Sequence, residues 1–425
     1  MVRGHHAVNR KFFQGVSVLM LGSGAAQVIA LACAPALTRL YVPDDYAALT
    51  VFLAITGVLL PFSCGKYEVA VVTASTDREA ASLIGLCLRI AAIAAIAMLV
   101  PAILGWEWIN WALGSDVLGR WLLAVPLAVV LGAVAMVARY AANRRSAYGL
   151  ISRYLVLQAM LSVGMNLAFG SAGWGSDGLL VANLVSISVG TFVLLWMLKP
   201  EMSMGWSSDW PSMKMAGWKY RDFPLYNASS TVLDSLTLAM PVFFIARLTS
   251  DETLGSYGFM MRIAQAPLSL IGGAVTQVHL KHLSELVRSG TPALGYLIRV
   301  ALALASLVVV PTLVLVIWAP AVFEVCFGVP WRHAGELLAI LIPSIAVQFV
   351  VSTLSPACGA TGHNKLGAVW KVIAFVSTLL MLWTLAIRGD VRALLPALAI
   401  LNVVLYVLYF GVICFAVTYP RSHHR

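Results

Sequence analysis

The stretch Leu294–Trp318, LGYLIRVALALASLVVVPTLVLVIW, decides the fold class of this chain. Its one charged residue is Arg299, and it is long enough to cross a bilayer core, which takes about 20 apolar residues in a helix. A spanning segment must satisfy its backbone hydrogen bonds internally, so a run of this kind is expected to be helical. The stretch therefore predicts a helical membrane protein.

Similar apolar runs recur along the whole chain. Of its 425 residues, 60% are hydrophobic and 11% are charged, whereas a soluble domain carries about 25% charged residues. The loops between the runs are short, so we expect an all-α membrane protein with about twelve transmembrane helices and no separate soluble domain. The expected spans are 13–37, 46–65, 81–104, 120–138, 154–170, 178–198, 226–247, 256–277, 294–318, 336–357, 367–388 and 394–418.

The basic residues predict the orientation of these spans. When loops are assigned to alternate sides, Lys and Arg are about three times as frequent on the side of the two termini as on the other side. Positive residues collect in cytoplasmic loops, so both termini are expected in the cytoplasm. The same rule accounts for the net charge of +10 without a nucleic-acid partner.

The longest polar segment, residues 199–225, predicts two lobes. It separates residues 1–198 from residues 226–425, and each part contains six expected spans. The two parts are weakly similar: Pro35, Arg39 and Pro61 recur in the same order as Pro241, Arg247 and Pro267. Two lobes with six spans each have the same orientation, as in parallel-repeat transporters. We therefore expect two six-helix lobes, joined by a cytoplasmic linker at 199–225, around a central cavity.

Ionisable residues inside the expected spans are the candidates for function: Arg89, Asp234, Arg262, Arg299 and Lys371. A charge at the bilayer centre costs about 2.5–3.5 kcal/mol, so such groups tend to face a partner or a watery cavity. Four of the five are cations, and a cavity that they line would suit an anionic substrate, because guanidinium groups bind phosphate oxygens bidentately.

Four of these residues also have an alternative role. Arg299 and Lys371 lie near span ends and could extend to the membrane interface. An interfacial position would also account for Arg262. Asp234 has a short side chain that would pair with a cation or titrate, so it is a candidate for ion coupling.

The sequence contains no familiar catalytic or cofactor motif. We find no P-loop, nucleophile elbow or H-E-x-x-H motif. The six cysteines form no C-x-x-C pair, and His279 and His282 alone are a poor ligand set, so we expect these histidines to be solvated. We therefore expect no cofactor, no metal site, no disulfide framework and no ATP hydrolysis in this chain.

Several short strings resemble segments of bacterial polysaccharide flippases. Lys66–Val72 (KYEVAVV) followed by Asp77–Ala81 (DREAA) resembles one of their cytoplasmic segments. Further similar strings are Thr38–Tyr46 in the first outer loop, Tyr220–Tyr226 before span seven, and Phe327-Gly328 with Trp331, Ala334-Gly335 and Pro343 before span ten. These strings cover both halves in order. The chain resembles the Wzx-type O-antigen and exopolysaccharide flippases of the MOP superfamily.

This resemblance implies a two-lobed transporter of the bacterial inner membrane. Such a protein turns undecaprenyl-pyrophosphate-linked oligosaccharide repeat units from the cytoplasmic to the periplasmic leaflet, in lipopolysaccharide or exopolysaccharide biosynthesis. The family's cavity is cationic, and Arg89, Arg262, Arg299 and Lys371 are the residues that could supply this charge here. The implied partners are the lipid-linked substrate, membrane lipids, and a polysaccharide polymerase with other assembly proteins. Lys66 stands where arginine is usual, and lysine lacks the bidentate fork.

Two competing functions are also compatible with a chain of this kind. An ion-coupled multidrug or small-solute exporter of the same superfamily would be expected to carry more acidic residues in its spans. A membrane polysaccharide polymerase or ligase is disfavoured by the short outer loops, which leave little room to hold a sugar acceptor. We therefore expect a transporter and not an enzyme.

Overall fold

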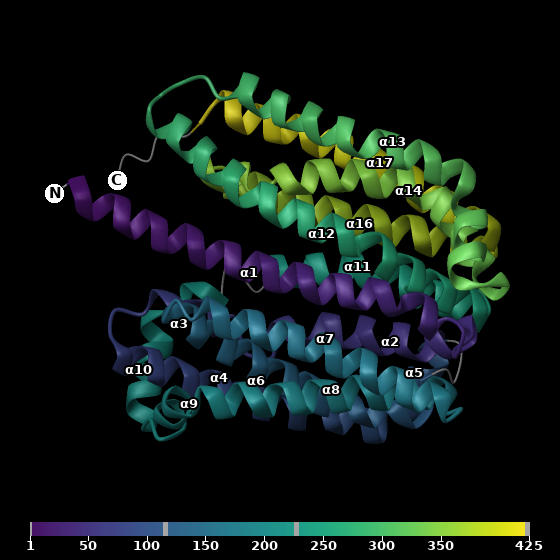
Figure 1. The fold of residues 1–425 in the computed structure, drawn as a ribbon, viewed down its shortest axis with the longest axis horizontal. Helices are drawn as coiled ribbons and strands as arrows, with labels where there is room; N and C mark the ends of the chain where they lie inside the picture. The colour runs from purple at the N-terminus through teal and green to yellow at the C-terminus, as the bar shows by residue number, and fades with distance from the viewer. Residues whose placement is uncertain (1, 114–117, 225–228, 421–425) are drawn as a thin grey trace. The chain divides into compact units, whose positions relative to one another are not determined.

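The computed structural model describes residues 2–113, 118–224 and 229–420 (Figure 1). The chain divides into two compact units, Met1–Arg247 and Leu248–Arg425. Each expected span is helical over most of its described residues, although the span at 46–65 ends in η1 and a turn, and residues 226–228 of the seventh span lie outside the described residues. The regular elements in the described ranges are all helical. The predicted all-α fold class is therefore confirmed.

The first unit contains eleven α-helices among its described residues. They are α1 (Val2–Leu37), α2 (Pro43–Leu59), α3 (Tyr67–Thr73), α4 (Asp77–Leu104), α5 (Trp106–Leu113), α6 (Val125–Arg144), α7 (Tyr148–Ser171), α8 (Gly175–Met197), α9 (Lys199–Trp206), α10 (Trp210–Lys219) and α11 (Ser229–Leu248), with the 3-10 turns η1 (Leu60–Phe62) and η2 (Gly119–Ala124). Helix α1 packs along α7, as Figure 1 shows, while α4 contacts α3, α6, α9 and α10.

The second unit is built around α14. Its elements are α12 (Asp251–Arg288), α13 (Leu294–Phe327), η4 (Val329–Trp331), α14 (Arg332–Leu354), α15 (Ala357–Ala360), α16 (Asn364–Arg388) and α17 (Val391–Thr418). Helix α14 contacts α12, α13 and α17. Large apolar side chains on α13, including Leu302, Leu313 and Ile317, are instead exposed. Apolar surface of this kind is stable against lipid tails and costly against water.

Eleven helices in the described ranges are long and apolar enough to span a membrane. The predicted eighth span falls outside this set. It lies in α12, which is 38 residues long but carries Arg262, Gln265, Gln277 and His279. At about 1.5 Å per residue, α12 is still long enough to cross a bilayer. The protein is a multi-pass membrane protein.

The expected linker at 199–225 is largely folded. It forms α9 and α10, and both helices pack on α4 of the first unit. Helix α11, expected to open the second lobe, groups with the first unit. The division into six-helix lobes at 1–198 and 226–425 stays a prediction.

Local sequence explains where several of these helices begin. Thr76 precedes α4 and accepts a hydrogen bond from the Glu79 backbone N–H (3.2 Å), and Ser250 does the same for Thr253 before α12 (3.3 Å). Such caps satisfy backbone donors that a helix leaves unpaired at its start. Because only three residues separate α3 from α4, the Thr76 cap also fixes the short connection between these two helices.

Glycine permits the close contact of α13 with α14. A Cβ atom added at Gly335 would clash with the Ala319 carbonyl oxygen and would lie 2.7 Å from the Pro320 Cα. The obstacle is backbone, which cannot rotate away as a side chain can. The two helices can approach this closely only with a residue at 335 that lacks a Cβ atom.

We therefore expect Gly335→Ala to destabilise the protein. The overpacking should cost about 1–3 kcal/mol, measured as a lower midpoint of thermal unfolding in detergent. Gly411→Ala in α17 is the matched control, because nothing lies within 4 Å of its added Cβ. That variant should be unchanged or slightly more stable, since alanine favours a helix by about 0.5–1 kcal/mol. Equal midpoints for the two variants would contradict this account of the α13–α14 contact.

Candidate functional site

The candidate site begins at a tight turn between η1 and α3. Gly65 and Lys66 both adopt left-handed backbone conformations, with φ of +57° and +63°. This conformation is strained for a residue with a Cβ atom, by roughly 1–3 kcal/mol. The turn leads into the short helix α3, which lies against α4 and α6. By the charge distribution, this end of the first unit is expected to be cytoplasmic.

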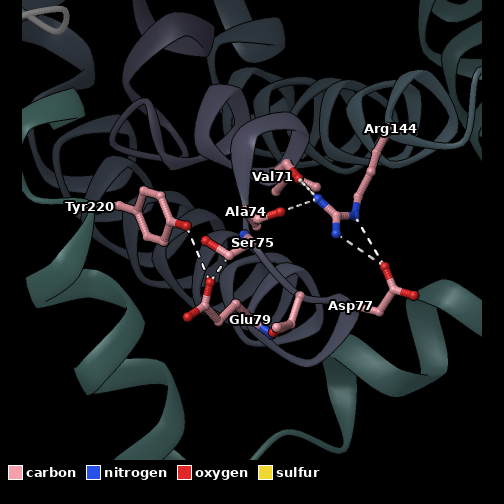
Figure 2. Close-up of polar contacts among 8 residues, drawn as sticks. Val71, Ala74, Ser75, Asp77, Glu79, Arg144 and Tyr220 are labelled. Atoms are coloured by element: carbon pink, nitrogen blue, oxygen red, sulfur yellow. Dashed lines mark hydrogen bonds and ion pairs between the residues drawn. The ribbon is translucent and has the colours of Figure 1, made fainter. Parts of the chain in front are cut away.

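Arg144, the last residue of α6, holds the far end of α3 (Figure 2). Its Nη1 donates to the carbonyl oxygens of Val71 (3.2 Å) and Ala74 (2.6 Å). Its Nη2 and Nε donate to Oδ1 of Asp77 at 3.1 and 3.3 Å. One guanidinium thus binds the unpaired carbonyls at the end of α3 and the first residue of α4, which favours a cation there.

Glu79 connects the short segment between α3 and α4 to α10. Its carboxylate accepts hydrogen bonds from the Ser75 backbone N–H (3.1 Å), the Tyr220 hydroxyl (3.2 Å) and Lys219 Nζ (2.5 Å). Figure 2 shows Tyr220 and Ser75 converging on this carboxylate. The hydrogen bond from Lys219 to Glu79 raises the pKa of the Lys219 ammonium. The contacts fix α10 beside α3 and α4.

Helix α10 lies with one face against α4 and the other exposed. Asp209 caps it by accepting a hydrogen bond from the Ser212 backbone N–H (3.2 Å). Hydrogen bonding from Ser212 lowers the pKa of the Asp209 carboxyl. Met213 is fully buried, whereas Trp210 and Trp218 are 60% and 63% exposed. Aromatic side chains with this exposure are typical of a membrane interface.

An open groove of about 340 Å³ lies between α3, α4 and α10. We call it the α10 groove; it is lined by Tyr67, Leu86, Ile90, Trp210, Met213, Lys214, Gly217, Trp218 and Arg221. The Arg221 guanidinium lies 5.1 Å from the Trp218 ring centroid, a cation–π distance. The Tyr67 hydroxyl donates to the Gly217 carbonyl oxygen (3.2 Å) and so ties α3 to α10. The groove combines two cations with three aromatic rings.

Arg89 lies next to this groove. It is half-buried on α4, and its Nη1 contacts Met213 Sδ at 3.0 Å while Nη2 donates to the Ser208 carbonyl oxygen at 3.4 Å. Met213 lines the α10 groove, so the Arg89 guanidinium adds positive charge beside it. Its predicted role in binding substrate stays a prediction.

The other predicted site residues lie on four different helices. Asp234 is half-buried on α11, and Lys371 is half-buried on α16. Arg262 is exposed on α12. Arg299 is exposed on α13, where its Nε donates to the Gly295 carbonyl oxygen of the same helix at 3.2 Å. Their grouping around one cavity stays a prediction.

Two features of the structure were not predicted from the sequence. The α10 groove lies in the segment expected to be a linker, although Trp210, Lys214 and Trp218 recur at the four-residue spacing of one helix face. The other is His279, which the sequence predicts to be solvated. It is 1% exposed and stacks on Tyr296 with ring centroids 5.5 Å apart, so that expectation is wrong.

Comparisons with known proteins agree with a membrane transporter. The sequence model of the family described as polysaccharide biosynthesis protein matches residues 36–336, which is most of the chain. The chain therefore belongs to this family, and the resemblance inferred from its sequence is confirmed. No curated protein matches it in sequence.

Solved structures that share this fold include transporters of the MOP superfamily. A multidrug resistance MATE family transporter of this superfamily, in an inward-facing conformation, is similar over 96% of both chains, with a TM-score of 0.71 and 13% identity. The lipid II flippase MurJ, inward closed, is similar over 93% of this chain and 87% of its own, with a TM-score of 0.74 and 11% identity. The MATE multidrug transporter DinF-BH is similar over 96% of this chain and 95% of its own, with a TM-score of 0.64 and 14% identity. At these identities the likeness establishes the fold alone.

Arg144→Lys tests the network that positions the candidate site. A lysine ammonium cannot reach the α3 carbonyls and Asp77 together in the planar fork that arginine provides. We expect a loss of about 2 kcal/mol in stability, within the range for charged hydrogen bonds, and faster amide hydrogen exchange in residues 67–74. Arg153→Lys, at an exposed position of α7, is the matched control and should change neither quantity. Exchange in residues 67–74 as slow as in the wild type would contradict the role given to Arg144.

Proposed function

We propose that this protein is a flippase for lipid-linked oligosaccharides. It would move undecaprenyl-pyrophosphate-linked repeat units from the cytoplasmic to the periplasmic leaflet of the bacterial inner membrane. The observation that carries the proposal is the match of most of the chain to a polysaccharide biosynthesis family. The fold of MOP-superfamily transporters supports a moving carrier over a synthetic enzyme.

The α10 groove has the chemistry to receive such a head group. A pyrophosphate carries negative charge, and Lys214, Arg221 and the neighbouring Arg89 offer cations with donors for its oxygens. Trp210 and Trp218 offer large, rigid faces for sugar rings. The exposure of these tryptophans supports a location at the membrane interface, where the polyprenyl tail would stay in lipid.

The later steps would follow from alternating access. In this proposal Arg89, Arg262, Arg299 and Lys371 form the cationic wall of a cavity between two lobes, and rocking of the lobes exposes the head group to the periplasm. The membrane potential, negative inside, favours outward movement of an anion by about 2.3 kcal/mol per charge per 100 mV. Asp234 is the candidate for additional proton or sodium coupling.

The cellular setting belongs to the same proposal. Both termini would lie in the cytoplasm, on the side of most basic loop residues. The product would pass to a polysaccharide polymerase and other assembly proteins for O-antigen or exopolysaccharide. An ion-coupled exporter of drugs or small solutes is the competing function within the same fold.

Deletion and complementation separate these two functions. A strain that lacks the gene should lose surface polysaccharide and accumulate the lipid-linked unit on the inner leaflet, and the wild-type gene should restore both. Unchanged polysaccharide in the deletion strain, together with sensitivity to drugs, would favour the exporter and contradict the flippase.

Variants of the α10 groove test its role within the same strain. We expect Arg221→Ala to weaken complementation about tenfold, because a charged hydrogen bond contributes roughly 1.5–3 kcal/mol and tenfold corresponds to about 1.4 kcal/mol. Trp218→Ala should weaken complementation by about two- to thirtyfold, because it removes a stacking face and the cation–π contact with Arg221, which contributes roughly 0.5–2 kcal/mol. Trp206→Ala is the matched control for Trp218→Ala, since Trp206 is 73% exposed on α9 and does not line the groove. Equal complementation by Trp218→Ala and Trp206→Ala, at equal protein levels, would contradict a role of the α10 groove in substrate binding.

A further inference from the structure

Two cysteines and a glutamate meet in the interior of the first unit. Cys64 follows η1, Glu68 is in the first turn of α3, and Cys87 is on α4. All three are fully buried. Their two sulfur atoms and one carboxylate oxygen lie within 4.8 Å of one another.

The strained turn creates this arrangement. Gly65 and Lys66 are consecutive left-handed residues between Cys64 and α3, so the chain makes a tight turn directly after the cysteine. Lys66 is one of two residues other than glycine with positive φ in the described ranges. Strain of this kind persists where the surrounding structure requires it, and it is frequent at functional sites. Here its effect is to turn Cys64 and Glu68 toward the same helix.

Glu68 is a buried carboxylate with unused oxygen atoms. Neither Oε1 nor Oε2 has a hydrogen-bond partner among the described residues. The nearest cation is Lys66, whose Nζ lies 3.7 Å from Oε1, beyond the usual range of a hydrogen bond. Burial raises the pKa of the Glu68 carboxyl, against the opposing effect of Lys66. A buried polar group normally has a hydrogen-bond or metal partner, so we expect a partner for this carboxylate.

We propose that Cys64, Glu68 and Cys87 form a binding site for Zn²⁺. Two thiolates and a carboxylate are a ligand set that zinc prefers, whereas Mg²⁺ and Ca²⁺ prefer oxygen ligands alone. With Zn–S bonds of about 2.3 Å and a Zn–O bond of about 2.0–2.2 Å, tetrahedral ligand atoms lie roughly 3.4–3.8 Å apart. Because the three ligand atoms already lie within 4.8 Å of one another, small side-chain rotations would bring them to these separations.

The charges of such a site balance. Two thiolates and one carboxylate carry three negative charges, Zn²⁺ supplies two positive charges, and Lys66 supplies the third. Binding would release the two thiol protons to solvent, together with the carboxyl proton where Glu68 is protonated. A water molecule would complete the tetrahedron. The site would tie the turn after η1 and the first turn of α3 to α4. Glu68 follows Tyr67, which lines the α10 groove, so bound metal would stiffen that part of the groove wall.

Bound metal can be measured on the full-length protein, purified in detergent without a histidine tag. Elemental analysis should find about one zinc per chain, and substitution with Co²⁺ should produce a sulfur-to-cobalt charge-transfer band. Cys64→Ser, Cys87→Ser and Glu68→Gln should each weaken zinc binding at least about tenfold, as loss of a ligand or its support does. Cys358→Ser is the matched control, because Cys358 is also a buried cysteine but lies in the second unit.

A second measurement avoids variants that fold poorly. In the wild-type protein, zinc should slow alkylation of Cys64 and Cys87 and leave Cys358 unchanged, as mapped by mass spectrometry before and after chelation. Full zinc content in the Cys64→Ser/Cys87→Ser double variant would overturn the proposal. So would a wild-type protein that binds neither Zn²⁺ nor Co²⁺, or one isolated with a Cys64–Cys87 disulfide. None of these measurements depends on transport, so the zinc site and the flippase function can fail separately.

Discussion

The need to satisfy backbone hydrogen bonds in an apolar environment shapes this whole chain. Within lipid, a peptide group without an internal partner costs several kcal/mol, so each long apolar run is helical over most of its length. Polar contacts are then left to the helix ends. That is where Arg144, Glu79 and Asp209 act, by binding the carbonyls and N–H groups that α3, α4 and α10 leave unpaired. The candidate site lies where these ends meet.

The apolar environment also restricts where charged side chains are stable. Cations that are kept near or inside the membrane need anionic partners, and a substrate can supply them. Lys214 and Arg221 line an open groove beside Arg89, with exposed tryptophans at its rim. An anionic lipid head group that carries sugars matches this combination of charge and aromatic surface. The polysaccharide biosynthesis family to which the chain belongs is consistent with such a substrate.

The helices are predictable from sequence, whereas most of the site is not. The length and apolarity of runs such as 294–318 are enough to identify them as membrane-spanning helices. Helix α10 is hard to recognise because its buried face is only Met213, Ala216 and Gly217, within a segment of polar appearance. Cys64 and Cys87 are distant in sequence, and only the turn at Gly65-Lys66 and the packing of α3 on α4 bring them together. His279 lies within three residues of Gln277, Lys281 and His282 in the sequence, but Tyr296 of α13 stacks on its ring.

Transfer of the substrate between leaflets is the central claim, and a reconstituted system measures it most directly. Purified protein in liposomes, supplied with undecaprenyl-pyrophosphate-linked oligosaccharide in one leaflet, should expose the sugar to a reagent on the opposite side. We expect transfer that becomes faster when the membrane potential is negative on the donor side. Transfer no faster than in protein-free liposomes, with correctly folded protein, would contradict it.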